Sequence, residues 1–188
     1  MKIIPLKEAF PKEKRIDLFG CWRYIKFISF CSIMIRYMEE YMKERPPKTI
    51  LSKSEQKKIF EKVKKFVLKD LLPNPKINKI ILFGSLIKET FGRYEKPFKG
   101  RIYSDVDVLL LVENSFEVPN TWKKHFMGKI YQVYNRTKLD NEILIQYIVC
   151  KKEFYQNKKY QNIAEKWGVP LLLDKSKHKY VIIYEKKL

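Results

Sequence analysis

The sequence predicts an α/β (α+β) protein in which helices flank a small mixed β-sheet, preceded by a helical extension at the N-terminus. Short apolar runs bounded by turn residues are typical of buried strands, and segments with apolar residues at helical spacing separate them. The expected elements follow the order α–α–β–α–β–α–β–α–β, which favours a mixed sheet. The 188 residues are enough for one ordinary domain with an appended element. We therefore expect an extension over residues 1–50 and the main domain over residues 51–188.

The extension is expected to contain a helix over residues 18–42. Its apolar side chains recur at helical spacing: Leu18, Cys21, Trp22, Ile25, Ile28, Cys31, Ile35, Met38 and Met42. Arg23, Lys26 and Arg36 interrupt the run, which falls short of the roughly 20 apolar residues that a membrane span needs. We expect no stable membrane insertion. The pattern favours a helix that packs on the core or on another chain, so a homo-oligomer could form through it, and a helix lying on a membrane surface is the alternative.

Two prolines, Pro46 and Pro47, cannot continue a helix and predict a linker over residues 45–51. Ser52 and Glu55 then match the capping box that begins a helix. Beyond this box, apolar residues share one helical face and lysines crowd the other: Ile59, Val63, Phe66, Val67 and Leu71 against Lys57, Lys58, Lys62, Lys64, Lys65 and Lys69.

The middle of the chain carries two apolar strands, expected over residues 79–83 and 105–113. A Gly-Ser pair turns the chain after the first of them. Residues 86–91 favour one or two helical turns, and residues 93–101 are expected to form a polar loop.

The last third of the chain alternates between segments with helical spacing and segments typical of strands. Residues 121–138 and 160–168 have apolar side chains at helical spacing. Residues 142–150 and 180–185 are apolar enough to form strands.

The composition describes a basic protein without a cysteine or histidine cluster. Lys and Arg number 40 against 21 Asp and Glu, a formal charge of +19, which attracts polyanions such as nucleic acid, a nucleoside triphosphate, an acidic partner or a membrane surface. Cys21, Cys31 and Cys150 lie in apolar surroundings, so we expect reduced core residues of a cytoplasmic protein. His125 and His178 are too few for a histidine-built metal site.

Two aspartates stand at the head of the strand expected over residues 105–113. Alternate residues of a strand share a face, so Asp105 and Asp107 should project the same way, with their carboxylates a few ångströms apart. Two like charges that close are unfavourable unless a cation neutralises them. Mg²⁺ prefers oxygen ligands and is usually bound through one or two carboxylates together with substrate phosphates. The aspartate pair therefore predicts a site for Mg²⁺ or Mn²⁺.

The Gly-Ser pair after the other strand complements this site. Gly84 lacks a side chain, so backbone N–H groups can approach a phosphate, and the following helical turns would direct their positive end there. The Ser85 hydroxyl can donate to a phosphate oxygen, and Ser104, directly before the aspartate pair, is expected in the same nucleotide-binding site. The two strand ends together predict a cradle for a divalent metal ion and a nucleoside triphosphate, with ATP as the expected nucleotide.

The combination of these motifs resembles the nucleotidyltransferase superfamily that includes DNA polymerase β, and most closely its minimal nucleotidyltransferase branch. Members carry Gly-Ser, a short helix and then Asp-x-Asp, and Gly84, Ser85, Asp105 and Asp107 match those positions. The resemblance covers residues 54–170, including the stretch "NIAEKWGVPLL" near the end, whereas the extension has no counterpart.

This resemblance implies a nucleotidyl transfer reaction. Two Mg²⁺ ions would be held by Asp105, Asp107 and a third carboxylate on a neighbouring strand. A hydroxyl of the acceptor would attack the α-phosphorus of the triphosphate and pyrophosphate would leave, while the ions stabilise the attacking and leaving oxygens. No protein nucleophile is needed, because the rest of the catalysis is positioning.

The spacing of the two motifs departs from the family pattern. Nineteen residues, Leu86 to Ser104, separate Gly-Ser from Asp-x-Asp where the family has about ten, and an insertion in a loop costs little. The added segment mixes aromatic residues with cations, which could stack a base or an acceptor, although an ordinary surface loop would show the same composition: Arg93, Tyr94, Lys96, Phe98, Lys99, Arg101 and Tyr103.

The third carboxylate is the second departure. It should lie on the strand over residues 142–150, where the alignment places Ile145 or Gln146 in its position, and neither is acidic. Glu142 lies near the strand start with the parity of Gln146 and could reach the metal ions from there, and Asp140 is a weaker substitute. We take Glu142 as the candidate third catalytic carboxylate, without which transfer would be slow or absent.

The acceptor stays open at this point. The basic surface suits an RNA end, such as that of a tRNA, bound through its phosphates. It suits a partner protein equally, because some minimal nucleotidyltransferases resemble antitoxins that adenylylate a toxin of the HEPN type. It disfavours an aminoglycoside, since a chain of charge +19 repels a polycation. The alternative to an enzyme is a nucleotide-binding or antitoxin-like module that acts by binding a partner protein.

Overall fold

The computed structural model describes residues 45–72, 74–98, 100–127, 130–140, 142–166 and 168–187. The helix expected over residues 18–42, with Cys21, Cys31 and the oligomer contact assigned to it, lies outside the described residues. Pro46–Leu188 forms one compact unit. Within the described part of the chain, no helix is long and apolar enough to cross a membrane.

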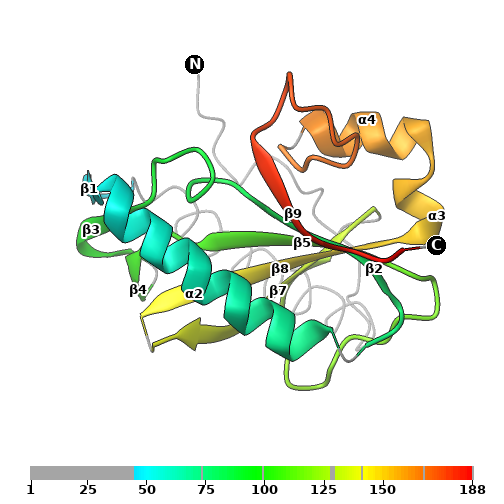
Figure 1. The fold of residues 1–188 in the computed structure, drawn as a ribbon, viewed down its shortest axis with the longest axis horizontal. Helices are drawn as coiled ribbons and strands as arrows, with labels where there is room; N and C mark the ends of the chain where they lie inside the picture. The colour runs from blue at the N-terminus through cyan, green and yellow to red at the C-terminus, as the bar shows by residue number, and fades with distance from the viewer. Residues whose placement is uncertain are drawn as a thin grey trace, which may run out of the picture. The chain divides into compact units, whose positions relative to one another are not determined.

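A six-stranded mixed sheet forms the centre of this unit (Figure 1). Its order is β6 (Lys123–Met127), β7 (Gln132–Leu139), β8 (Ile143–Lys151), β5 (Val106–Val112), β2 (Ile77–Phe83) and β9 (Tyr180–Glu185). Strands β5 and β8 are parallel, and every other neighbouring pair in this sheet is antiparallel. The strands predicted around residues 79–83, 105–113, 142–150 and 180–185 are all present, and the predicted fold class is confirmed.

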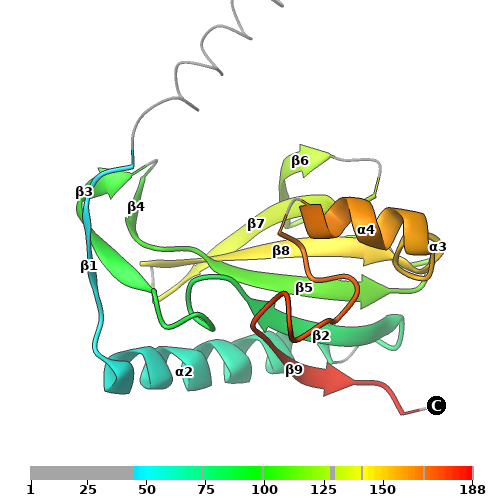
Figure 2. The ribbon, with the colours of Figure 1, turned by 90° about the horizontal axis from the view of Figure 1, so that it is seen from above.

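Helices cover both faces of the sheet (Figure 2). Helix α2 (Lys53–Leu71) packs on one face, and α3 (Lys152–Tyr155) and α4 (Lys158–Lys166) lie on the other. Because successive side chains of a strand point to opposite faces of the sheet, the apolar core is divided into two clusters, one on each face. Val63 and Val67 of α2 share a cluster with Val108 of β5, whereas Ala164 of α4 shares the other with Leu109. One strand therefore presents apolar side chains to helices on both sides.

The predicted capping box begins α2. Glu55 N donates to Ser52 Oγ over 3.3 Å, and Ser52 N donates to Glu55 Oε2 over 2.9 Å. These hydrogen bonds from Ser52 hold the pKa of the Glu55 carboxyl below its ordinary value. They also satisfy two backbone donors that a helix start leaves unpaired.

A second, three-stranded sheet of order β1-β3-β4 lies beside the first. It consists of β1 (Lys48–Ile50), β3 (Gly92–Phe98) and β4 (Arg101–Tyr103). The prediction of a polar loop over 93–101 is therefore wrong. Of the linker predicted over residues 45–51, residues 48–50 form a strand, while the compact unit begins at Pro46. Tyr94 and Phe98 are buried and pack against each other with ring centroids 5.7 Å apart, and this packing outweighs the polar composition of the segment.

The predicted helix over residues 121–138 is also wrong, because this segment forms the antiparallel pair β6 and β7. Its apolar residues happened to fall at helical spacing, but tertiary contacts decide the outcome. Trp122, just before β6, stacks on Tyr147 of β8 with ring centroids 4.3 Å apart. Tyr134 of β7 lies 6.0 Å from the same Trp122 ring. These contacts join residues too distant in sequence for a periodicity argument to include.

Candidate functional site

The two motifs singled out in the sequence meet at one end of the main sheet. Strands β2 and β5 are antiparallel neighbours, and the last residue of β2, Phe83, pairs with Asp107. Gly84 and Ser85 therefore leave β2 directly beside the head of β5. The expected juxtaposition of the Gly-Ser turn with the Asp-x-Asp strand is present.

Gly84 is in contact with the carboxylate of Asp107. Its φ of +78° belongs to the left-handed region that favours glycine. A Cβ built on Gly84 would lie 2.1 Å from Asp107 Oδ2, far inside van der Waals contact. Glycine is thus required here both for backbone conformation and for space.

The chain after Gly84 forms a single turn where one or two helical turns were expected over residues 86–91. Lys88 N donates to Gly84 O over 3.0 Å, and Thr90 N donates to Ser85 O over 2.9 Å. Glu89 has a φ of 60°, which ends any helical path. The predicted helix terminus is therefore reduced to a single turn.

The side chain of Gln56, on α2, supports this turn through hydrogen bonds. This residue was not identified from the sequence. Its side chain is buried, donating to Leu51 O over 2.8 Å and to Glu89 O over 3.3 Å. It also accepts from Phe91 N over 3.3 Å. A glutamine on the buried side of a capped helix was the signal available in the sequence, because a polar group there needs backbone partners.

Ser85 and Ser104 have different roles in the structure. The Ser85 hydroxyl donates to the backbone carbonyl of Asp105 over 3.4 Å, so it joins the turn to the head of β5. Ser104 is 2% exposed, and its hydroxyl lies 3.4 Å from both the N and the O of Gly92 and accepts from Lys48 Nζ over 3.3 Å. These contacts direct Ser104 toward the second sheet, and they do not support its expected role in nucleotide binding.

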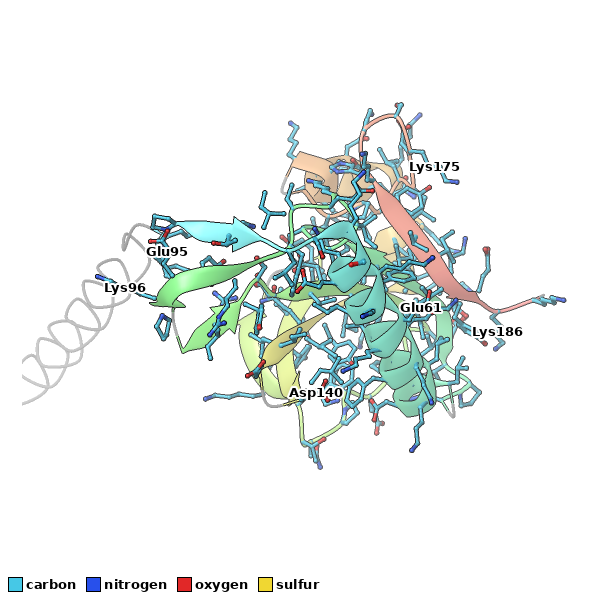
Figure 3. The ribbon with its side chains drawn as sticks, turned by 60° about the vertical axis from the view of Figure 1, so that its left-hand side comes forward. Glu61, Glu95, Lys96, Asp140, Lys175 and Lys186 are labelled. Atoms are coloured by element: carbon cyan, nitrogen blue, oxygen red, sulfur yellow. The ribbon has the colours of Figure 1, made fainter. Side chains whose placement is uncertain are left out.

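Asp105 is paired with a cation that sequence reasoning did not assign to it. Arg101 Nη1 donates to Asp105 Oδ2 over 2.7 Å, and the two side chains are 15% and 25% exposed. Arg101 comes from β4, within the segment that was expected to be a polar loop. The strand pairing that folds this segment back could not be deduced from spacing alone. Two other charged residues of this segment, Glu95 and Lys96, extend instead from β3 at the outer end of the second sheet (Figure 3).

Gln146 of β8 takes the position next to Asp107. In the parallel pair of β5 and β8, Asp107 is level with Gln146, and Val106 is level with Ile145. Ile145 is fully buried in the cluster beneath α2, so it faces away from Asp107. The alternative between Ile145 and Gln146 is resolved in favour of Gln146. On the other side of Asp107, Phe83 of β2 and then Tyr180 of β9 are level with it. Gln146, Asp107, Phe83 and Tyr180 thus form one row across the sheet.

The structure does not bring Glu142 or Asp140 to this row. Glu142 is exposed in the turn before β8 and precedes Gln146 by four residues, which is about 13 Å along a strand at roughly 3.3 Å per residue. Asp140 forms an ion pair with Lys62 of α2 at 3.1 Å. Neither carboxylate gains support as the third metal ligand.

Two carboxylates remain for a divalent ion at this end of the sheet. Among the described residues, no three His, Cys, Asp or Glu side chains form a group that could hold a metal ion. Asp105 and Asp107 still fit the way proteins usually bind Mg²⁺, through one or two carboxylates with phosphates and water completing the shell. The donor set thus fits an ion that arrives with a phosphate ligand.

The chain matches no protein-family model and no curated protein.

Proposed function

We propose that this chain is a nucleotidyltransferase that binds a nucleoside triphosphate, ATP being the simplest choice, at Gly84, Ser85, Asp105 and Asp107. The observation that carries the proposal is the contact between Gly84 and the Asp107 carboxylate. It places the Gly-Ser turn against a carboxylate that can share a cation with a phosphate.

Mg²⁺ or Mn²⁺ would be held by Asp107 with a contribution from Asp105. When bound, such an ion stabilises negative charge on the phosphate oxygens and on the leaving group. The chain's own residues orient the triphosphate through the turn. In the reaction, an acceptor hydroxyl oxygen forms a bond to the α-phosphorus, the bond to the bridging oxygen of pyrophosphate breaks, and the hydroxyl proton passes to solvent.

Slow transfer is expected because Gln146 stands beside Asp107. An amide cannot accept a proton from a hydroxyl at neutral pH. General-base assistance typically contributes about 10²–10⁴-fold in rate. We therefore propose an enzyme that positions its substrates well and deprotonates the acceptor poorly.

A second candidate function is a nucleotide-binding or antitoxin-like module that acts by binding a partner protein. The pairing of Asp107 with Gln146 favours it, because the module needs no base at that position. The two candidates share the triphosphate site and differ in whether an acceptor becomes labelled.

The acceptor is proposed to be an RNA end, such as that of a tRNA, or a partner protein. The charge of +19 favours polyanions, and one exposed face of α2 carries many of the cations: Lys57, Lys58, Lys62, Lys65 and Lys69.

The proposal is tested by incubating the full chain with each α-labelled triphosphate, Mg²⁺ or Mn²⁺, bulk tRNA and cell lysate. Label on RNA or protein that disappears in Asp107→Asn supports transfer. Asp140→Asn is the matched control, because it removes the same charge from an exposed turn. Triphosphate binding without any label supports the binding module, whereas absence of both contradicts the proposed site.

A further inference from the structure

The additional residues between the Gly-Ser and Asp-x-Asp motifs build the hairpin of β3 and β4, and this hairpin brings a cation to the site. Arg101 begins β4 and lies four residues before Asp105. Its Nη1 donates to Asp105 Oδ2 over 2.7 Å, while the Ser85 hydroxyl donates to the backbone of the same aspartate. The guanidinium is therefore placed beside both motifs.

Two neighbours hold this guanidinium in position. The carboxylate of Asp105 accepts a hydrogen bond from it, and the centroid of the Phe98 ring lies 5.7 Å from Arg101 Cζ. Phe98 is itself buried, so the ring provides a fixed surface for a cation–π contact. A guanidinium fixed in this way loses little additional side-chain freedom when it binds a ligand.

Among the residues that the structure describes, most of the hydrogen-bond donors of Arg101 have no acceptor and could bind a ligand. A guanidinium carries five N–H groups, and within the described ranges Asp105 is the acceptor to which Arg101 donates. The planar fork of these groups matches the oxygens of a phosphate. The side chain keeps 15% of its surface exposed, so a ligand can reach it.

We infer that Arg101 binds the triphosphate of the donor nucleotide, and that Asp105 acts chiefly by positioning Arg101. The inference rests on the proposed function and assigns to this site a phosphate-binding residue outside the Gly-Ser and Asp-x-Asp motifs. It leaves Asp107 as the principal carboxylate for a divalent ion.

The charges of the site agree with this assignment. Gln146 stands beside Asp107, so the row lacks a third carboxylate. Close carboxylates repel one another, and bound cations relieve this repulsion. A site with fewer carboxylates is therefore expected to bind fewer divalent ions. A fixed guanidinium supplies positive charge to the phosphates without needing metal ligands of its own.

The test is binding of an ATP analogue with a non-hydrolysable α,β bond to the full chain, measured by calorimetry in EDTA and again in Mg²⁺. The fixed guanidinium predicts measurable affinity in EDTA, lowered about tenfold or more in Arg101→Gln, because a charge-assisted pair is lost. Arg93→Gln is the matched control. It removes an equal charge from an exposed position of β3 and should change the affinity less than threefold.

Each outcome decides the inference. Equal losses in Arg101→Gln and Arg93→Gln would mean general attraction to a basic chain and would overturn it. Binding that requires Mg²⁺ would overturn the inference about Arg101 but would still agree with the proposed function. Absence of binding in both buffers would contradict the inference and the proposed function together. If Arg101→Gln does not fold, Arg101→Lys replaces it and should bind several-fold more weakly than Arg93→Lys, since lysine keeps the charge but lacks the fork.

Discussion

The carboxylate of Asp107 lies directly against the backbone of Gly84, at the distance where any side chain on Gly84 would overlap it. The two residues are far apart in sequence and meet because β2 and β5 pair with Phe83 opposite Asp107. A change at either residue must therefore alter the other.

Gly84→Ala should lower both the stability of the chain and its affinity for a triphosphate. The left-handed φ alone costs an alanine about 1 kcal/mol or more, and the new Cβ also displaces the Asp107 carboxylate. Urea denaturation and calorimetry measure the two effects.

Gly168→Ala is the matched control for Gly84→Ala. Gly168 has the same φ of +78°, but nothing lies within 4 Å of an added Cβ. It should show the backbone cost without loss of triphosphate binding. Equal binding by both variants would mean that the phosphates lie elsewhere.

Gln146→Asp should raise transferase activity, by up to about 10²-fold, because it places a carboxylate level with Asp107 that can assist removal of the acceptor proton. The initial rate of label transfer measures the effect. Glu142→Gln should leave the rate within about twofold, since Glu142 lies about 13 Å along β8 from Gln146. A Gln146→Asp variant that binds triphosphate normally and gains no activity would argue for the binding module.

Gln56→Ala should destabilise the chain by about 1–3 kcal/mol, because it leaves buried backbone groups of the turn without their partner. It should also weaken triphosphate binding, since the turn after Gly84 loses its support. Gln161→Ala, which removes a single hydrogen bond to Tyr155 O, should cost less and leave binding unchanged. Chemical denaturation with parallel calorimetry separates these outcomes.

Cys150 should resist alkylation in the folded chain. Burial raises the pKa of its thiol to about 12, so the reactive thiolate is scarce at neutral pH. Because the folded pKa lies above the unfolded value of 9.0, the thiol's contribution to stability is present below that value and is lost as the pH rises toward 12. Iodoacetamide labelling followed by peptide mapping should modify Cys150 only after denaturation. Rapid labelling of native protein would contradict the burial.

Local features of this chain could be predicted from the sequence because the forces that form them act between near neighbours. Ser52 and Glu55 are close enough for their hydrogen bonds to be visible as a capping box. The strands β2 and β5 are almost uniformly apolar, and α4 has its apolar residues at helical spacing. The Gly-Ser and Asp-x-Asp motifs at the strand ends then indicated where a site would be.

Segments of mixed composition could not be assigned in this way. Residues 93–101 and 121–138 contain polar residues between aromatic ones, and such patterns fit a loop, a helix or a strand about equally. Cross-strand partners decide among them. Strand β3 pairs with β1 and β4, and Trp122 stacks on Tyr147 of β8.

The sequence by itself determined that this protein is a mixed α+β chain with a glycine turn and an aspartate pair at the ends of two buried strands. Only the tertiary structure decided which residues meet there: Asp107 with Gly84 and Gln146, and Asp105 with Arg101. The physical reason is register. A shift of one residue in β8 would place Ile145 beside Asp107 and exchange the side chains that β8 contributes to the two core clusters, so the packing of the whole strand sets the neighbours of a single carboxylate.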